Sequence, residues 1–265
     1  MKDKIIDFLE YSTGRTISYS MASTWYKCPY SYYLRYVKKI KKPKPLHFVR
    51  GDVVHQALAY IKREGVRDMK KLDNPIEKAW EKATDVPEGV KDGEDLNMEV
   101  ELARTKNLIA GWLKQKRASP ISPNHVEMNL LKDLYNPRDR RQFDGMKLRG
   151  IIDEQRTPNG ITEIKTANRE WNAGREKFEW QADVYCLLLG QDIEVVYDFL
   201  IDTNVPKYIL SKPIKKTFKQ DGYRAFKMLS EFVQATELEF FCPSRGFMCG
   251  SLCEYSEECL KWPQE

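Results

Sequence analysis

The stretch that decides the fold is KLRGIID, residues 147–153, followed by TEIKT, residues 162–166, and QADVY, residues 181–185. The first two segments hold apolar, β-branched runs on either side of Pro158-Asn159-Gly160, which is a turn-forming sequence. We therefore expect a hairpin of two strands and then a helix. These elements contain, in order, an acid (Asp153), an acid-x-lysine pair (Glu163 and Lys165) and a glutamine-x3-tyrosine pair (Gln181 and Tyr185).

The register of this hairpin decides which side chains meet. A three-residue loop with Gly160 in the left-handed region would pair Thr157 with Ile161. Asp153, Glu163 and Lys165 would then share one face of the ladder. A two-residue Asn-Gly loop would instead put Pro158 in the ladder and turn Asp153 away from Lys165.

Two carboxylates on one face suit a hard cation such as Mg²⁺ or Mn²⁺, which takes oxygen ligands and keeps several waters. Lys165 can orient or help deprotonate an attacking water and offset charge on a phosphorane-like transition state. Glu-x-Lys pairs are also frequent in a chain with 31% charged residues. An exposed strand of alternating charge would explain Glu163 and Lys165 alone equally well, so the neighbouring motifs decide between the two interpretations.

Two further motifs supply candidate residues. Gln181 and Tyr185 stand four apart, so helical spacing puts both on one face, where their polar ends can reach a phosphate or Lys165. The alternative is an interfacial helix with a core tyrosine. His55 stands in Arg50-Gly-Asp-Val-Val-His55, on an apolar helix where it could also be a packed histidine.

Cysteines are concentrated at the two ends of the chain. Four of the six (Cys242, Cys249, Cys253 and Cys259) fall in the last 24 residues, and Cys28 lies near the beginning. The first residues, MKDKIID, do not look like a signal peptide, so we expect a reducing, intracellular compartment and metal ligation rather than disulfides. Four thiolates suit a [4Fe-4S] cluster or structural zinc. Cys186, in an apolar segment, is expected to be a small buried hydrophobe.

Taken together, these motifs resemble the PD-(D/E)XK nuclease superfamily, and within it the branch containing the RecB nuclease domain, the AddB proteins and the CRISPR-associated iron-sulfur exonucleases. The resemblance covers nearly the whole chain. It includes residues 17–20 (ISYS), residues 25–36 (WYKCPYSYYLRY) and the Gly51-x3-His55 element.

The resemblance implies a role for each candidate residue. His55, Asp153 and Glu163 would bind the metal together with the Ile164 carbonyl, and Lys165 would be catalytic. Gln181 and Tyr185 would contact DNA or support the site. Cys28 with Cys249, Cys253 and Cys259 would hold a [4Fe-4S] cluster that clasps the chain ends together. The Cys249-x3-Cys253 spacing is one residue longer than usual in the family, so Cys242 is a possible substitute ligand.

Charge points to a nucleic-acid partner. The formal net charge is +5, and residues 38–44 (KKIKKPK) place five lysines in seven residues. Such a run is either a solvated loop or a phosphate-binding segment. Tyrosines at positions 26, 30, 32, 33 and 36 precede it, and aromatic faces stack on unpaired bases while lysines follow the backbone. The segment therefore predicts single-stranded DNA binding.

The predicted architecture is one α/β domain, residues 1–265, with a restriction-endonuclease-like core, a mixed central sheet flanked by helices, a helical insertion at 56–123 and a cysteine-rich tail at 238–265. Helices are expected near 20–36, 49–64, 75–83, 95–117, 174–189 and 215–237, with a loop at 85–93. Strands are expected near 124–135, 147–156, 161–166, 194–202 and 206–210. No apolar run approaches the 18 residues that a transmembrane helix needs, and no P-loop is present.

The sequence thus predicts a Mg²⁺- or Mn²⁺-dependent DNA exonuclease that prefers single-stranded ends and acts in recombination, repair or replication. Any helicase or recombination partner would be a separate chain. The alternative is a noncatalytic DNA-binding or complex-assembly module with an iron-sulfur or zinc clasp. Cytoplasmic location is expected, and a viral origin stays open.

Overall fold

A computed structural model describes residues 16–85, 90–91, 97–115, 125–170, 174–203, 205–244, 246, 249 and 253–262. The opening residues MKDKIID and most of the predicted 85–93 loop lie outside this part. The helices are α2 (Tyr19–Lys27), α3 (Pro29–Tyr32), α4 (Leu46–Glu64), α5 (Asp73–Thr84), α6 (Met98–Gln115), α7 (Gln181–Leu189), α8 (Tyr223–Glu237) and α9 (Ser256–Cys259). Short 3₁₀ segments are η2 (Met69–Lys71) and η5 (Arg175–Phe178), and π-helical segments are η1 (Tyr33–Val37) and η6 (Phe218–Gly222).

The described strands form a mixed seven-stranded sheet and a small two-stranded parallel pair. The strands are β1 (Thr16–Ser18), β2 (Lys44–Pro45), β3 (Val90–Lys91), β4 (Val126–Tyr135), β5 (Gln142–Thr157), β6 (Gly160–Ala167), β7 (Ile193–Ile201), β8 (Lys207–Leu210) and β9 (Ile214–Lys216). The large sheet runs β1-β5-β6-β7-β8, with β4 added to β5 and β9 added to β7. Only the β1–β5 and β6–β7 pairs in it are parallel, so the predicted mixed α/β core is confirmed.

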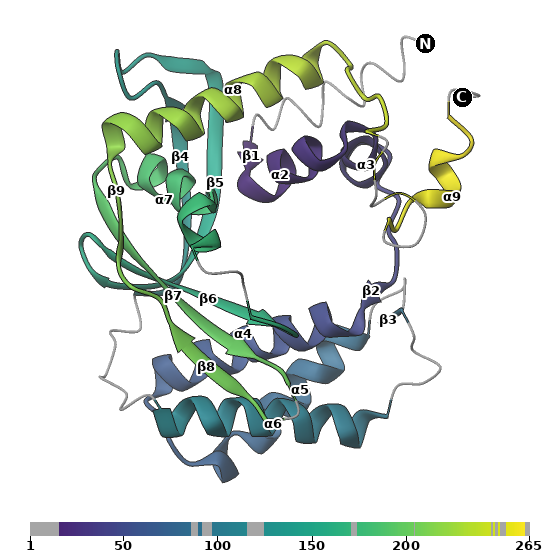
Figure 1. Ribbon diagram of the computed structural model, residues 1–265, viewed down its shortest axis with the longest axis vertical. Coiled ribbons are helices and arrows are strands. Elements are labelled where there is room, and N and C mark those ends of the chain that lie inside the picture. Colours follow the sequence, from purple (N-terminus) through teal and green to yellow (C-terminus); the bar gives the residue numbers. More distant parts are fainter. Residues whose placement is uncertain are drawn as a thin grey trace.

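Helices cover the sheet in two separate layers (Figure 1). Successive side chains of β7 point to opposite faces of the sheet, so alternate residues pack against the two helix layers. Val195, Tyr197 and Phe199 join the core formed with α2, α7 and α8. Leu200 joins Ile164 of β6 in the core formed with α4, α5 and α6. The adjacent strands β6 and β7 are therefore covered by helices on both faces.

The β5–β6 hairpin differs from the predicted one. The loop has two residues, Pro158 and Asn159, and Thr157 pairs with Gly160 rather than with Ile161. A Cβ at Gly160 would lie 2.6 Å from the Thr157 hydroxyl, which explains the glycine. The predicted three-residue loop was therefore wrong.

A shift in the ladder nevertheless brings the acids together. The pairing shifts by one residue between Gln155 and Thr157, so that Glu154 pairs with Thr162. One step further along this register, Asp153 comes opposite Glu163. An irregularity of this kind changes which side chains share a face, because the side-chain period of a strand is two.

Other differences concern helix limits. The predicted helix at 20–36 is divided at Cys28, whose backbone is extended (φ −161°), with α2 ending before it and α3 beginning after it. The predicted helix at 174–189 is α-helical only from Gln181, and the one at 215–237 begins as strand β9 and a π-helical segment. β1 was not predicted. None of the described helices is both long and apolar enough to cross a membrane.

A buried ion pair fastens α4 to β5. The Lys62 ammonium donates to the Glu154 carboxylate, which is fully buried and also accepts from Arg156. Lys62 lies two helical turns beyond His55 on α4, and Glu154 is the neighbour of Asp153 on β5. This pair therefore holds together the two elements that supply His55 and Asp153.

We expect Lys62→Met to lower the free energy of unfolding by about 3 kcal/mol, because the fully buried Glu154 loses its buried partner and keeps only the exposed Arg156. The matched control is Lys106→Met, which breaks partly exposed pairs with Asp73 (2.8 Å) and Glu77 (3.2 Å) and should cost less than about 1 kcal/mol. Urea unfolding at neutral pH measures both. The double variant Lys62→Met/Glu154→Leu should recover most of the loss, and equal losses in the two single variants would contradict the assignment.

Candidate active site

The site begins where β5 and β6 separate. On this edge of β5, β6 pairs with residues 154–157 and β1 pairs with residues 147–149, so the segment between them faces an opening in the ladder. The Ile164 backbone N–H donates to Asp153 Oδ2 (2.8 Å), and the Tyr185 hydroxyl lies 3.0 Å from the Ile151 carbonyl oxygen. The side chains of Asp153 and Tyr185 thus provide partners for the Ile164 N–H and the Ile151 carbonyl, which have no partner in the β5–β6 ladder where these strands separate.

Glu163 and Lys165 extend from β6 toward α7. Lys165 Nζ donates to Glu163 Oε1 and to Gln181 Oε1, each at 2.8 Å. Gln181 Nε2 donates to the Tyr185 hydroxyl (2.7 Å), and that hydroxyl lies 2.7 Å from Glu163 Oε2. The four side chains form a closed hydrogen-bonded ring, which fixes both carboxylate oxygens of Glu163.

His55 approaches from α4 because Gly51 lets that helix come close to β6. A Cβ at Gly51 would lie 2.7 Å from the Thr166 hydroxyl oxygen. One helical turn later, His55 Nδ1 lies 3.4 Å from Asp153 Oδ1. The Gly51-x3-His55 spacing therefore has a physical basis. The glycine allows the helix to approach the strand closely, and the histidine one turn later can then reach Asp153.

Burial and mutual charge set the protonation of the acids and of His55. Burial alone would lower the pKa of His55, but the hydrogen bond and charge of Asp153, with the charge of Glu163, raise it above the usual value. Burial opposes ionisation of Asp153, yet His55, the Ile164 N–H and Lys165 together lower its pKa. Burial raises the pKa of Glu163, and the charge of Asp153 adds to this effect. The two carboxylates thus repel each other and share nearby positive charge.

Lys165 is a cation in this arrangement. Burial disfavours its charged form, but the Glu163 and Asp153 carboxylates outweigh burial and raise the pKa of Lys165 above its normal value. The pKa of Tyr185 is well above its usual value, because of burial and the nearby negative charges. Lys165 and Tyr185 therefore serve as hydrogen-bond donors near neutral pH.

The donor set fits a hard divalent cation. Two carboxylates, one imidazole and a backbone carbonyl are ligands that Mg²⁺ and Mn²⁺ accept. In the described part of the chain, no group of three or more His, Cys, Asp or Glu side chains is already arranged to hold a metal ion. The Glu163 carboxylate is hydrogen-bonded to Lys165 and Tyr185, and the Asp153 carboxylate contacts His55 and the Ile164 N–H. Binding of a metal ion by these acids would require the contacts to rearrange.

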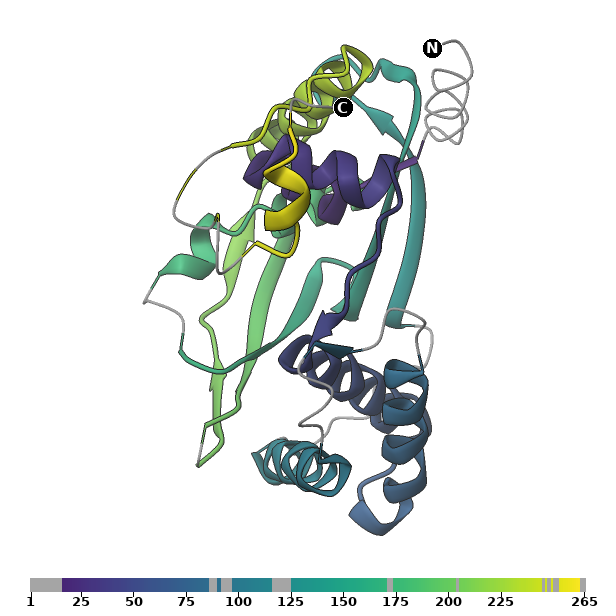
Figure 2. The same cartoon turned by 90° about the vertical axis from the view of Figure 1, so that its right-hand side faces the viewer.

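The cysteine-rich tail lies beside the N-terminal helices, as both views show (Figures 1 and 2). Tyr255 packs with Tyr30 and Leu34, and Cys28, Cys253 and Cys259 surround this small core. The Ser244 N–H points to the Cys28 sulfur (3.4 Å), and the Cys249 sulfur lies 3.6 Å from the Ser244 carbonyl oxygen. Cys242 is exposed, and the predicted burial of Cys186 is confirmed.

The N-terminal tyrosines are not arranged as predicted. Tyr30 and Tyr32 are buried, and Tyr33 stacks on Phe241. The Tyr26 hydroxyl donates to the Met228 carbonyl oxygen (2.9 Å). Alternating tyrosines on these helices therefore serve mainly to pack α2 and α3 against α8 and the tail. The prediction that their faces stack on DNA bases was wrong for the two buried rings.

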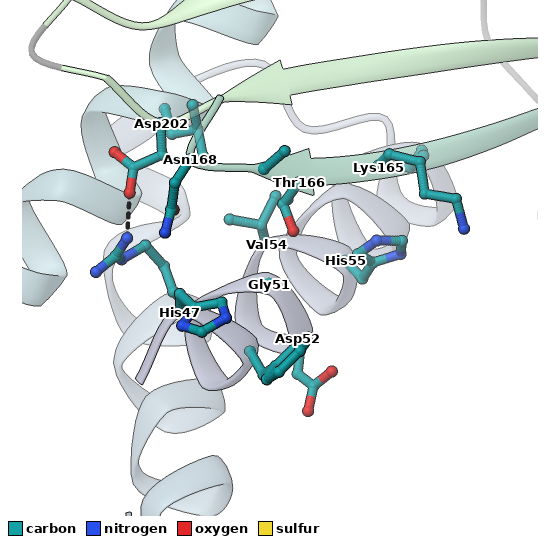
Figure 3. Close-up of a pocket in the computed structure, with 14 residues that line it drawn as sticks. His47, Gly51, Asp52, Val54, His55, Lys165, Thr166, Asn168 and Asp202 are labelled. Carbon is teal, nitrogen blue, oxygen red and sulfur yellow. Dashed lines mark hydrogen bonds and ion pairs between the residues drawn. The ribbon is translucent and has the colours of Figure 1, made fainter. Parts of the chain in front are cut away.

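Sequence reasoning missed a pocket beside the site. It has a volume of about 240 Å³ and extends from His55 and Lys165 to the first turn of α4 and the end of β6 (Figure 3). His47 of α4 and Asn168, which follows β6, contribute to its far end. No motif connects these two residues, since they are 121 positions apart in the sequence. Only the packing of α4 on β6 brings them together.

Comparison with known proteins identifies the class. A model of the PD-(D/E)XK nuclease superfamily matches residues 16–260, and the chain belongs to that superfamily. Among curated proteins, none matches the chain. The resemblance stated on the motifs is thereby confirmed for the superfamily.

One solved structure has a similar fold. A protein from Eubacterium rectale named "Putative exonuclease" superposes with a TM-score of 0.54 at 10% identity, covering 91% of this chain and 89% of that one. A second structure, named SSO0001, superposes with a TM-score of 0.31 at 12% identity, covering 81% of this chain and 89% of that one. The first of these supports the restriction-endonuclease-like architecture.

We expect Tyr185→Phe to lower the free energy of unfolding by about 2 kcal/mol, because Glu163 Oε2 and the Ile151 carbonyl oxygen lose the one buried hydroxyl that lies within hydrogen-bond distance of both. Tyr208→Phe is the matched control, since it removes one hydroxyl that donates to the Leu108 carbonyl oxygen (2.8 Å) at a less buried position. Its expected loss is about 1 kcal/mol. Urea titration of both variants gives the comparison, and a Tyr185→Phe protein as stable as wild type would contradict the hydrogen-bonded ring.

Proposed function

We propose that this protein is a divalent-metal-dependent DNA exonuclease. The observation that carries the proposal is the convergence of Asp153, Glu163, Lys165 and His55 where β5 and β6 separate. They come from three elements, and each acid makes specific contacts with the residues proposed to act beside it. An ordinary charged strand face would not bring a buried acid (Glu163), a half-buried acid and lysine (Asp153 and Lys165) and a helix histidine together.

The proposed ligands of the cation are Asp153, Glu163, His55 and the Ile164 carbonyl. A bound Mg²⁺ or Mn²⁺ supplies a Lewis acid for the phosphodiester and a water of lowered pKa. Lys165, as a cation, donates hydrogen bonds to the attacking water and stabilises negative charge that develops on the phosphate. Gln181 holds the Lys165 ammonium, and Tyr185 holds Glu163.

DNA with unpaired ends is the proposed substrate. Lys38, Lys39, Lys41 and Lys44 are exposed in the basic segment that leads into α4, the helix that carries His55. Lysines at such a position can track a phosphate backbone toward the site. Action in recombination, repair or replication, beside a separate helicase or recombination protein, is the cellular role that we propose.

We expect purified protein to degrade end-labelled single-stranded DNA faster than blunt duplex in Mg²⁺ or Mn²⁺. Glu163→Gln should reduce cleavage by about a hundred-fold or more, because a metal ligand is lost. The matched control is Glu194→Gln, at an exposed position on the neighbouring strand β7, which should cut normally. Circular single-stranded DNA tests for free ends, since an exonuclease spares it.

Several outcomes would contradict this function. Undiminished cleavage by Glu163→Gln, or cleavage that persists in EDTA, would exclude the proposed metal site. Binding of DNA without cleavage in any metal would favour a noncatalytic DNA-binding module. Faster degradation of blunt duplex than of single strands would overturn the strand preference alone.

We propose further that Cys28, Cys249, Cys253 and Cys259 hold a [4Fe-4S] cluster that joins the two ends of the chain. The support is that the tail returns to α2 and α3, where three of these sulfurs border one core and the fourth shares the Ser244 backbone with Cys28. Zinc bound by the same thiolates is the alternative. A reducing, cytoplasmic compartment accords with both.

We expect anaerobically purified protein to be brown and to contain iron and acid-labile sulfide. Cys253→Ser should remove the colour and loosen the tail, whereas Cys242→Ser, at an exposed thiol outside the proposed set, should keep both. Visible absorbance and iron and zinc analysis separate the alternatives. Colourless protein with one zinc per chain would show that the thiolates bind zinc and not a cluster. Loss of colour in Cys242→Ser would show that Cys242 is one of the ligands.

A further inference from the structure

The pocket beside the site has two chemically different ends. One end contains Lys165 and His55, and the other contains His47 and Phe48, in the first turn of α4, and Asn168. Figure 3 shows His47 and Asn168 together at one side, and His55 and Lys165 at the other. At about 240 Å³ it is smaller than the roughly 300–1,000 Å³ pockets that enclose whole drug-sized ligands, so it admits a part of a nucleotide.

The far end presents aromatic surface to solvent. Phe48 is 60% exposed, and its ring centroid lies 4.4 Å from that of His47, with the two planes inclined by 34°. An exposed phenylalanine adds little to the stability of the fold, because its surface stays in water. Here it stands beside a second exposed ring at the mouth of a pocket, which is the arrangement that stacks on a base.

At the site end of the pocket, the Lys165 ammonium is held by Glu163 and Gln181, each at 2.8 Å. Arg50, which also lines the pocket, is engaged by the carboxylates of Glu101 and Asp202. Asp52 is paired with Lys44 at 2.9 Å. One end of the pocket therefore adjoins the site where the reacting phosphate is proposed to lie, and the other end offers two rings and the Asn168 amide for a base. A DNA strand presents both kinds of group, phosphates and bases.

We propose that this pocket is a nucleotide subsite, in which Phe48 and His47 stack on an unpaired base of the strand whose phosphate lies at Lys165. The inference rests on the proposed nuclease function and names the part of the substrate that the site recognises. A base in a duplex is already stacked and paired, so the subsite selects single-stranded DNA.

Helix and strand geometry indicate which base is held. His47 and His55 are eight residues apart on α4, or about 12 Å. Lys165 and Asn168 are three residues apart along β6 and its continuation, or about 10 Å. At 3.4 Å per nucleotide, the spacing along one strand of duplex DNA, this span is about three steps, and an extended single strand covers it in fewer. The recognised base therefore lies about one to three nucleotides from the reacting phosphate.

The test measures binding separately from cleavage. Short fluorescent single-stranded oligonucleotides are prepared with normal bases or with one abasic position at each of the first five places from the end, and anisotropy in EDTA gives their Kd. We expect Phe48→Ala to raise the Kd of the normal oligonucleotide about 5- to 150-fold, the range for loss of one stacked base. Wild type should show a similar loss with one abasic position, and Phe48→Ala should lose nothing further there.

The matched control is Tyr135→Ala, which removes an exposed ring at the hairpin end of β4, far from α4 (Figure 1), and should bind like wild type. Phe48→Ala binding that equals wild type, or losses that simply add at every abasic position, would overturn the subsite even if the protein cuts DNA. The subsite would stand and the nuclease function would be rejected if one abasic position weakened binding by wild type but not by Phe48→Ala, while wild type cut no DNA in Mg²⁺ or Mn²⁺. Absence of any DNA binding would reject both.

Discussion

The hydrogen bond from the Ile164 N–H to the Asp153 carboxylate is the interaction on which the site depends. It replaces a ladder bond where β5 and β6 separate, so an acidic side chain is ordered by the backbone itself. Because Asp153 is then held near His55, the position of α4 follows, and Gly51 allows that helix to reach the strand. Glu163 is held independently through Tyr185 and Lys165. The two acids thus have separate supports, and their mutual repulsion is compensated by the two basic side chains.

Much of this arrangement could be predicted from the sequence, because its signals are local. Alternating β-branched residues around Pro158-Asn159-Gly160 indicate the hairpin, and Gln181 and Tyr185 fall on one helical face at a spacing of four. The structure brings these predicted residues together with Asp153, Glu163 and Lys165. The predicted α/β core and the superfamily are confirmed. The roles of the individual residues, the single-domain division and the cluster stay predictions.

The remainder depended on tertiary contacts that local patterns do not contain. The shifted register between Gln155 and Thr157 adds one residue on one strand only, and turn composition alone does not indicate such a shift. Tyrosines on α2 and α3 had the spacing of an exposed binding surface, yet α8 and the C-terminal tail cover the buried ones. β1 is only three residues long and is a strand because β5 offers it an edge. In each case a partner distant in sequence decided the outcome.

The meeting of the two chain ends has a consequence for biosynthesis. The Tyr255 hydroxyl donates to the Ile40 carbonyl oxygen (3.0 Å) across a separation of 215 residues. At the roughly 5–20 residues per second of translation, the N-terminal helices wait about 10 to 40 s after their own synthesis for this partner. During that interval the apolar surface around Tyr30 and Leu34 is accessible to chaperones on the nascent chain. The residues of the two large hydrophobic cores all precede Tyr255 in the chain, so this contact closes only after they have been synthesised.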